Sequence, residues 1–504
     1  DMIEQQIIAS KAVLHLAAQY RETVLTNAVH KALRQTERGA EDASAGIIIR
    51  PDQHDPLTVM TMLNKLQRQG IDLFRMNRKM VVGQRSYPSG TYFIPMNQPK
   101  RGVIKSLLER TFFPDDAWTR FQDGTPNPPY DTVTDTMAEM MGVAVEHCPV
   151  PSSELKVEKK SFVRVSEPIC PIGQVTETSH GYLIDPRSNQ AYHAVNRLLA
   201  AGAVVKRLPD PITAGESNLP RGSFLITDAA GQDLHAMAGE TGVTFSGQTD
   251  SVKNVPQDMR SARTGLYRRY WGGNMDEGWT RLVLEQFAFP YETLWDDRVL
   301  AGDLEEQFDV IILPDDTADM IVGGDVAIEK RLQNRPVPEH YWSGIGDTGV
   351  ENVKAFVEAG GTLIALNGAC AFAIKKLGLQ IADVTTRLSR KEFFCPGSTL
   401  RLKAQSGHAL AYGMPEDLLG MCWNSPAFAV QPSHYNHLYE IVVSYPEQEI
   451  LQSGWLIGEE HLAGKAAMVS VSYGEGRVIL YGLRPQFRAQ THGTYKLLFN
   501  ALYT

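Results

Sequence analysis

Residues 361–374 read GTLIALNGACAFAI, an apolar run followed by a short turn and a second apolar run. The pattern is typical of a buried strand that passes through a sharp turn into a helix. Gly368 stands two residues before Cys370, as a glycine does where enzymes expose a nucleophile on a strand-to-helix elbow. Cys370 is therefore either a catalytic thiol or a small buried residue, and the choice decides whether this half of the chain is an enzyme.

The flanking sequence favours a structural Cys370. An elbow nucleophile sits where strand and helix crowd together, so small residues are needed on both sides, yet Phe372 follows two residues later. The partner histidines on offer are His492 and His408, and neither is followed by the acid that amidotransferases place beside their histidine. Unpaired cysteines are also often buried and inert. A thiol hydrolase or amidotransferase that uses Cys370 and His492 stays as the alternative.

From Gly265 to the C-terminus, predicted strands and helices alternate regularly. FDVIILPDD (308–316) predicts a buried strand with an acidic end, and VENVKAFVEAGG (350–361) predicts a helix stopped by glycine. AAMVSVSYGEGRVILYGL (466–483) predicts a hairpin. The alternation predicts a flavodoxin-like doubly wound sheet over residues 264–504, the α/β architecture of class I glutamine amidotransferase-like domains.

The region before this sheet contains an internal repeat. A short strand closed by proline, GIIIRP (46–51), matches GYLIDP (181–186), and each is followed by a helix that ends on a glycine. A proline-glycine turn that leads into a strand then recurs at residues 87–94 and 219–226. The repeat predicts two copies of one βαβ-type unit that complete each other's core, because the faces of such a sheet need cover.

We place the first copy, with a proline-rich crossing segment, at residues 41–150 and the second copy at residues 151–263. The polar segment 251–264 marks the boundary with the last domain. Residues 1–40 carry apolar positions at helical spacing, which predict a helix over 2–38 that stops at a glycine. Because the chain starts with Asp and shows no signal peptide, we expect this helix to belong to or follow an upstream domain of a longer protein.

The bulk composition excludes several classes of partner. The 504 residues include 49 Lys and Arg against 58 Asp and Glu, a formal charge of −9, and no basic stripe that would bind nucleic acid. No apolar run approaches the roughly 18 residues that span a bilayer. The five cysteines are scattered and never in CxxC spacing, which argues against a disulfide framework and a cysteine zinc site. We expect neither a nucleic-acid partner nor a membrane span.

Nine segments spread over nearly the whole chain carry a family resemblance. They are IIRPDQHDPLTVMTMLNKLQRQGIDLFR (48–75), YPSGTYFIPMNQPKR (87–101), PPYDTVTDT (128–136), NMDEGWTRLVLEQF (274–287), FDVIILPD (308–315), VEAGGTLIAL (357–366), FFCPGSTLRL (393–402), SGWLIGEEHLAGKAAMVSV (453–471) and RPQFRAQTHGTYKLLFNALY (484–503). Together they resemble the C-terminal region of large bacterial zinc carboxypeptidase-family metallopeptidases (carboxypeptidase A-like). The resemblance implies a parent protein that releases C-terminal residues from peptides.

The same resemblance implies that the peptidase domain and its zinc ligands lie upstream of residue 1. We therefore expect the zinc and the peptide substrate to be bound there, and no cofactor in this segment. A secreted or periplasmic location follows from the resemblance, and an oligomer is compatible with it. The predicted function is the non-catalytic C-terminal part of such a peptidase; the alternatives are an independent ligand-binding or assembly module and the Cys370 thiol hydrolase.

A zinc site inside the chain would need two imidazoles and a carboxylate, with one position open to water. The only His-x-x-Glu is His437–Glu440, with His461 and His492 as candidates for a third ligand. In an extended segment, positions three apart point to opposite faces, so His437 and Glu440 should not converge. A solvated histidine and a surface glutamate are the expected outcome.

Two stretches could bind a ligand at the sheet. Arg484, Arg488, His492 and Lys496 follow the last strand, at the carboxyl edge where doubly wound sheets bind ligands, with solvated charges as the alternative. YWGGN (270–274) leads from a strand into a helix and resembles a phosphate cradle. Acidic residues fill the first turn of that helix and would repel an anion, so an N-cap role for Asn274 is the better interpretation; the acidic residues are Asp276 and Glu277.

Overall fold

The computed structural model divides into two compact units, unit 1 and unit 2. Unit 1 comprises Asp1–Gln53, Thr61–Glu109 and Ala144–Ile169, and unit 2 comprises His54–Met60, Arg110–Val143 and Cys170–Thr504. The residues that the structure describes are 1–155, 159–176, 178, 180–214, 217–248, 252, 256–270, 273–323, 338, 344–430 and 436–503. Part of the predicted boundary segment 251–264 and of the YWGGN turn lies outside the described residues.

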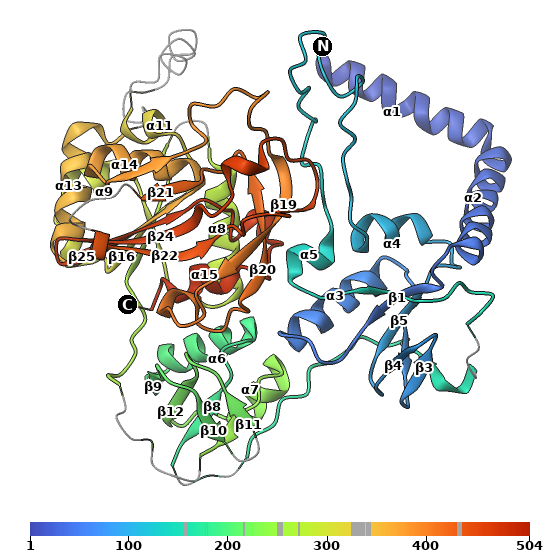
Figure 1. Ribbon diagram of the computed structural model, residues 1–504, viewed down its shortest axis with the longest axis horizontal. Helices are drawn as coiled ribbons and strands as arrows, with labels where there is room; N and C mark the ends of the chain where they lie inside the picture. Colours follow the sequence, from blue (N-terminus) through green and yellow to red (C-terminus); the bar gives the residue numbers. More distant parts are fainter. Residues whose placement is uncertain are drawn as a thin grey trace. The chain divides into compact units, whose positions relative to one another are not determined.

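Unit 1 is built on an antiparallel sheet with the strand order β6-β1-β5-β2-β7. Its strands β1 and β5 are labelled in Figure 1. Ile48, Met76, Phe93 and Cys148 lie in its buried core. The elements are β1 (Gly46–Ile49), β2 (Phe74–Met76), a hairpin of β3 (Met80–Val82) and β4 (Arg85–Tyr87), β5 (Tyr92–Pro95), α4 (Arg101–Leu108), β6 (Glu146–His147) and β7 (Phe162–Arg164). Helix α3 (Pro56–Arg68) follows β1 and contains residues of both units.

Unit 2 contains a second small sheet with the order β13-β8-β12-β9, again antiparallel throughout. A hairpin precedes its central strand, as β3 and β4 precede β5. The elements are β8 (Tyr182–Ile184), α6 (Asn189–Ala200), β9 (Val204–Arg207), β10 (Ile212–Ala214), β11 (Ser217–Leu219), β12 (Phe224–Asp228), α7 (Leu234–Thr241) and β13 (Ser246–Gly247). β6, β1, β5 and β2 of the first sheet correspond in order and pairing to β13, β8, β12 and β9 of the second, and β7 is an additional strand of the first sheet. This correspondence confirms the internal repeat.

The repeated unit is a split βαβ unit. β8 and β9, the strands on either side of α6, are both antiparallel to β12, so they are parallel to one another but separated by it. β1 and β2 have the same relation to β5. The sequence pattern predicted the strand-helix-strand order but could not show the third strand between the parallel pair.

The C-terminal part of unit 2 contains a parallel sheet in the order β15-β14-β16-β17-β25. Numbered along the chain, this order is 2-1-3-4-5, the flavodoxin-like order. The strands are β14 (Thr264–Tyr267), β15 (Glu292–Leu294), β16 (Val310–Leu313), β17 (Thr362–Leu366) and β25 (Gly476–Tyr481). The α/β fold class and the doubly wound sheet are therefore those expected from the sequence.

Antiparallel strands extend this sheet beyond β25. β24 pairs with β25 as a hairpin in which Tyr473 lies opposite Gly476, and β22, β19 and β20 follow in that order. The elements are β18 (Ile381–Asp383), β19 (Pro396–Ala404), β20 (Asp417–Trp423), β21 (Phe428–Val430), β22 (Tyr439–Ser444), β23 (Leu451–Ser453) and β24 (Ala466–Tyr473). Of these elements, the hairpin and the extended segment at Glu440 were expected from the sequence.

Helices cover both faces of the parallel strands. Val310 and Ile312 of β16 pack with α8 and α15 on one face, whereas Ile311 and Leu313 pack on the other face with α9, α10, α11, α13 and α14. This alternation follows from the strand period of two. The helices are α8 (Met275–Gln286), α9 (Asp296–Ala301), α10 (Leu304–Gln307), α11 (Ala318–Val322), α13 (Gly346–Glu358), α14 (Cys370–Leu377) and α15 (Tyr495–Asn500), and α5 (Met137–Met141) precedes the second copy.

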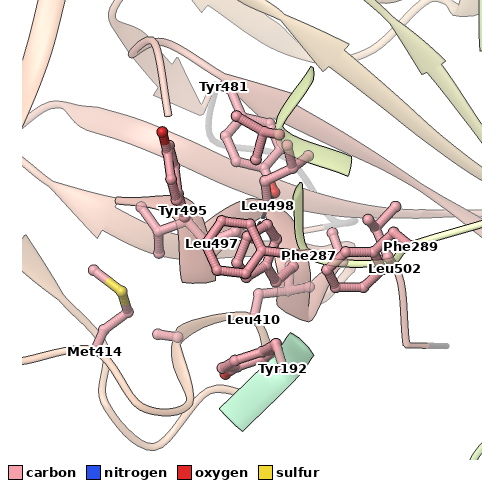
Figure 2. Packing of buried hydrophobic residues seen from close by; sticks show 14 of the residues in the cluster. Tyr192, Phe287, Phe289, Leu410, Met414, Tyr481, Tyr495, Leu497, Leu498 and Leu502 are labelled. Atoms are coloured by element: carbon pink, nitrogen blue, oxygen red, sulfur yellow. Dashed lines mark hydrogen bonds between the residues drawn. The ribbon is translucent and has the colours of Figure 1, made fainter. Parts of the chain in front are cut away.

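The second copy shares its core with the C-terminal sheet. Figure 2 shows Tyr192 of α6 beside the aromatic and aliphatic side chains of α15 and of the loop after α8. The ring of Tyr192 lies 5.4 Å from that of Phe499 and 5.3 Å from that of Phe224, centroid to centroid. The sequence pattern did not indicate this shared core, since it suggested that the two copies would cover each other.

The N-terminal segment forms two helices, α1 (Met2–Gln19) and α2 (Arg21–Glu41), where one helix ending at Gly39 was predicted. Tyr20 separates them with φ −106° and ψ 27°. Gly39 lies inside α2, and a Cβ there would stand 1.9 Å from the carbonyl oxygen of Met96. That glycine permits a close approach and does not stop the helix. No helix in the described residues is long and apolar enough to cross a membrane.

Candidate functional site

Polar side chains from four parallel strands meet at the carboxyl edge of the C-terminal sheet. β14 leads to Arg269, β16 to Asp315 and Asp316, β17 to Asn367, and β25 to Arg484. The helices that follow β14 and β16 pack on opposite faces, so a crevice opens between the ends of these two neighbouring strands. Open α/β sheets bind their ligands at such a switch point.

Asp315 is the centre of the hydrogen-bond network at this edge. Its Oδ1 accepts from Nδ2 of Asn367 at 3.0 Å and from the backbone nitrogen of Gly368 at 2.8 Å. Its Oδ2 accepts from Nη2 of Arg484 at 2.5 Å. A Cβ on Gly368 would stand 2.8 Å from Oδ1, so the glycine lets the backbone reach the carboxylate. Asp315 thereby links the ends of β16, β17 and β25.

Asp276, in the first turn of α8, is the second carboxylate of the network. It accepts from the backbone nitrogen of Asp315 at 3.1 Å and from Nε2 of Gln486 at 2.8 Å, and Nη1 of Arg484 lies 3.5 Å from its Oδ2. Burial raises the pKa of Asp276 to about 6, although the charge of Arg484 acts in the opposite direction. Asp276 can therefore hold or release a proton near neutral pH.

Asp316 and Asn274 complete the switch point. Asp316 accepts from Nε of Arg269 at 2.5 Å, and burial raises the pKa of Asp316 against the effect of this bond. Asn274 caps α8, because its Oδ1 accepts from the backbone nitrogens of Asp276 and Glu277 at 2.9 and 3.2 Å. The N-cap role predicted from the sequence is therefore the one that Asn274 has.

A pocket of about 640 Å³, the switch-point pocket, opens beside this network. Its charges pair largely among themselves: Arg281 lies 3.5 Å from Glu277, and Arg484 is bonded to Asp315. The residues that line it are Arg268, Arg269, Gly273, Asn274, Met275, Asp276, Glu277, Gly278, Trp279, Arg281, Asp315, Trp423, Asn424 and Arg484. The pocket has the size of a small-molecule site but no clear excess of either charge.

Cys370 is fully buried at the first position of α14. Its Sγ donates to the carbonyl oxygens of Ala365 at 3.3 Å and Tyr481 at 3.5 Å. Burial raises the pKa of the Cys370 thiol well above its usual range. Because the thiolate is the nucleophilic form, this environment disfavours the reactive state of the thiol. Cys370 packs as a small residue in the buried core.

Asn367, three residues earlier, has the backbone conformation of an elbow. It follows β17 directly and has φ 50°, a left-handed conformation that asparagine tolerates better than most residues. The side chain is 4% exposed, its Nδ2 is held by Asp315, and its Oδ1 has no hydrogen-bond partner. The strand-to-helix turn is therefore present, but an amide stands where a nucleophile would be.

A second pocket, of about 690 Å³, has Asn367 in its lining. We refer to it as the elbow pocket. It is lined by Asn367, Gly368, Cys370, Ala371, Ile374, Lys375, Ile381, Ala382, Asp383, Val384, Thr385, Thr386, Arg387, Asn424 and Pro426. Cys370 is among these residues, but its thiol is directed at the two carbonyl oxygens and has no exposed surface.

The zinc candidates do not converge on one another. His437 lies in a short turn and Glu440 lies in β22, where Oε2 of Glu440 meets Nε2 of His408 at 3.2 Å. His461 lies in another turn, before β24. Among the described residues, no group of three or more His, Cys, Asp or Glu side chains could hold a metal ion.

The charged residues predicted to form a cluster after β25 lie in different environments. Arg484 belongs to the carboxyl-edge network, but Arg488 pairs with Asp131 and stacks on Phe487. His492 packs on Tyr495 with 4.8 Å between ring centroids. Lys496 is buried and donates to Oδ1 of Asn189 at 3.3 Å. Of these four residues, Arg484 alone lines one of the two pockets.

Sequence reasoning missed Asp276, Asp315 and Asn367 as members of the site. The acidic end of FDVIILPDD was a usable signal, because a carboxylate directly after a parallel strand lies at the ligand-binding edge. Asp276 was assigned to the helix dipole alone. Nothing in the sequence could show that the turn after β17 places its left-handed residue at Asn367, three positions before the cysteine.

Comparison with known proteins adds little to this description. No protein-family model matches the chain, and no curated protein matches it. Among solved structures, a protein described as ThuA-like from Bacteroides uniformis is similar over 48% of this chain and 89% of its own, with 11% identity and a TM-score of 0.27. A β-galactosidase from Bacillus circulans matches 47% of this chain and 31% of its own (11% identity, TM-score 0.27).

An exo-β-1,4-mannosidase from an Opitutaceae bacterium is similar over 48% of this chain and 36% of its own, with 12% identity and a TM-score of 0.28. Structural similarities this weak support no conclusion about activity.

Proposed function

We propose that this chain is the non-catalytic C-terminal part of a zinc carboxypeptidase-like metallopeptidase, and that its amidotransferase-like domain binds a ligand without thiol chemistry. The observation that carries the second half of the proposal is the environment of Cys370. A fully buried thiol bonded to two carbonyl oxygens offers neither thiolate character nor access to a substrate. The two pockets at the carboxyl edge favour binding as the role of this domain.

The N-terminal helices support a place in a larger protein. α1 has no buried residue, although it contains many apolar residues. Its large apolar side chains are exposed, among them Ile8 at 67% and Leu14 at 69%. Exposed apolar side chains that gather in one place often mark a surface that another part of a protein covers. In the resembled family a peptidase domain precedes this segment, and such a domain would supply the cover.

The first half of the proposal is tested by metal binding and peptide cleavage. This 504-residue chain should retain no stoichiometric zinc after dialysis and should release no C-terminal residues from peptides. A protein extended upstream to include the resembled peptidase domain should do both, since its zinc-bound water and glutamate base would lie in the added segment. Stoichiometric zinc retained by the 504-residue chain and lost in His437→Ala would overturn the proposal.

The second half is tested on the thiol. Iodoacetamide should label Cys370 slowly in the folded protein and rapidly after denaturation, and Cys370→Ala should leave any activity of the longer protein unchanged. Cys170 provides the control within the same molecule, because it is exposed. Fast labelling of Cys370 at neutral pH, together with a hydrolase or glutaminase activity that labelling abolishes, would establish the thiol hydrolase instead.

A further inference from the structure

The charges of the switch-point pocket balance overall but not locally. Four arginines and four carboxylates meet in and beside it, namely Arg268, Arg269, Arg281 and Arg484 with Asp276, Glu277, Asp315 and Asp316. At the buried end, the guanidinium of Arg484 is shared by Asp276 and Asp315. At the exposed end, Arg268 and Arg281 share Glu277. The buried end is therefore rich in acid, and the exposed end has one positive charge in excess.

Arg268 and Arg281 have N–H donors that the described part of the chain does not use. The Nε of Arg281 lies 3.5 Å from Oε1 of Glu277, and the Nε of Arg268 lies 4.0 Å from its Oε2. Charge-assisted hydrogen bonds are shorter, at about 2.7–2.9 Å. Both arginine side chains are more than one third exposed, whereas that of Glu277 is 3% exposed. Since a guanidinium carries several N–H donors, both arginines can still bind an oxyanion from the solvent side.

The rest of the lining favours an apolar ring in the ligand. Trp279 and Trp423 line the pocket and are half-buried, and Met275 is 76% exposed. Indole rings and thioethers make favourable contacts with flat apolar groups. The pocket volume of about 640 Å³ is that of a small-molecule site and exceeds the needs of an inorganic ion. Because the exposed end has one positive charge in excess, the matching ligand is an organic monoanion.

Asp276 is the carboxyl group that responds to a new negative charge in this pocket. It lines the pocket, and burial raises its pKa to about 6. The charged groups that face it are Arg484, from the segment after β25, and Asp315, from the end of β16, and the amide of Gln486 donates to it. An anion at the exposed end adds a negative charge nearby, which favours the protonated form of Asp276. Proton uptake would then restore the neutral charge of the site.

We propose that the switch-point pocket binds a small organic monoanion with an apolar ring, and that Asp276 takes up a proton when this anion binds. The anionic group is held by Arg268 and Arg281, and the ring contacts Trp279 and Trp423. The proton comes from the solvent and stays on the Asp276 carboxyl group until the anion leaves. This inference deepens the proposed function, and rests on it, because it names the ligand class of the domain that binds without thiol chemistry.

The test is a calorimetric titration of the 504-residue chain with two probes, phenylacetate and benzenesulfonate. Both probes keep their negative charge from about pH 5.5 to about pH 8, so any pH dependence of binding comes from the protein. We expect saturable binding of at least one probe at about pH 5.5, and the tighter of the two shows whether the arginines prefer a planar or a tetrahedral anion. Phenylacetamide, which has the same ring but no charge, should bind at least about tenfold more weakly.

The pH dependence tests the role of Asp276. The affinity should be at least about fivefold higher at about pH 5.5, where Asp276 is mostly protonated, than at about pH 8, where it is ionised. Titrations near pH 7 in two buffers with different ionisation enthalpies measure the protons taken up on binding. We expect a net uptake, because Asp276 of the free protein is mostly ionised at this pH.

Variants locate the anion and the proton. Arg268→Met and Arg281→Met should each weaken binding of the tighter probe at least about tenfold, as expected for the loss of hydrogen bonds to a charged group. Arg298→Met is the matched control, because Arg298 is exposed but does not line the pocket. Asp276→Asn replaces the carboxyl group by a neutral amide of the same shape. This variant should bind the probe at about pH 8 as tightly as the unchanged protein does at about pH 5.5, without proton uptake.

Three outcomes overturn the inference: no saturable binding of either probe, equal binding of phenylacetamide, or proton uptake that persists in Asp276→Asn. An affinity of the unchanged protein that is the same at both pH values overturns it as well, even if Asp276→Asn fails to fold. Binding that is unchanged in both Arg268→Met and Arg281→Met places the ligand elsewhere and has the same consequence. Each outcome is distinct from failure of the proposed function, which is decided by zinc and peptide cleavage in the longer protein and by the labelling of Cys370.

Discussion

The two copies of the repeat place an arginine and an aromatic residue at equivalent positions but in opposite environments. In the first copy Arg75 lies opposite Tyr92 across β2 and β5, and in the second copy Arg207 lies opposite Phe224 across β9 and β12. The guanidinium carbon of Arg75 is 6.0 Å from the ring centroid of Tyr92, and that of Arg207 is 4.9 Å from the centroid of Phe224. Both copies thus keep an arginine over an aromatic ring.

The surroundings of the two pairs differ. Arg75 is exposed and Tyr92 is half-buried, whereas Phe224 is fully buried, and Arg207 donates to Oδ1 of Asn500 at 2.5 Å. The pair in the second copy has become part of the contact with the C-terminal sheet. A repeated element can therefore keep its strand pairing while one copy serves as a surface and the other as an internal layer.

The largest expected effect comes from removing the second copy altogether. A fragment of residues 264–504 loses the partner of α15 and exposes the apolar residues that pack on Tyr192 and Phe224. We expect it to bind an apolar dye and to unfold without a sharp transition, because its core is incomplete. Circular dichroism during heating is the measurement, and a fragment of residues 170–504 is the control that should unfold more cooperatively. Cooperative unfolding of 264–504 at the same temperature would show that the shared core is dispensable.

Truncating the aromatic residues at the equivalent positions should have the next largest effect. The loss of stability should differ between the two copies. Phe224→Ala creates a cavity in the shared core and should lower the free energy of unfolding of unit 2 by about 3–5 kcal/mol. Tyr92→Ala, at the half-buried equivalent position, should lower that of unit 1 by about 1 kcal/mol. Urea unfolding followed by fluorescence and circular dichroism measures both. Similar losses in the two variants would mean that the second copy is no more embedded than the first.

Substitution of the two equivalent arginines should give the smallest difference in the free energy of unfolding. Arg207→Met keeps most of the side-chain stem but loses the donors to Asn500 and to the hydroxyl of Tyr192, and should cost about 1.5–3 kcal/mol. Arg75→Met should stay within about 0.5 kcal/mol, as exposed substitutions usually do. The measurement is the shift of the urea midpoint in each variant. An equal shift in both variants would contradict the conclusion that the two arginines have different environments.

Much of the fold could be predicted because its signals are local. Proline and glycine mark the ends of strands and helices in both copies. Short, largely apolar runs such as TLIAL indicate buried parallel strands. The antiparallel extension escaped prediction because the order of β19, β20 and β22 depends on pairings between residues far apart in the sequence. The shared core escaped for the same reason, since nothing local distinguishes Phe224 from Tyr92.

The candidate site was predictable in position but not in composition. The carboxyl edge follows from the strand order, and Arg484 was placed there correctly because it comes directly after the last strand. Asn367 was overlooked in favour of Cys370, because the sequence cannot show which residue of a turn takes the left-handed conformation. The role of Asp276 depends on Gln486 and Arg484, more than 200 positions away, and is visible only once the chain is folded.

The bonds that Asp315 makes to Asn367 and Gly368 bear on how the protein ages. Asn-Gly is the dipeptide most prone to spontaneous deamidation, which begins when the glycine nitrogen attacks the asparagine side-chain carbonyl. Here Asp315 holds both the nitrogen of Gly368 and Nδ2 of Asn367, so the attacking nitrogen is occupied and the amide cannot rotate freely. Folded protein should keep Asn367 intact on long storage, and conversion of this residue to aspartate or isoaspartate would be a chemical record of molecules that had unfolded.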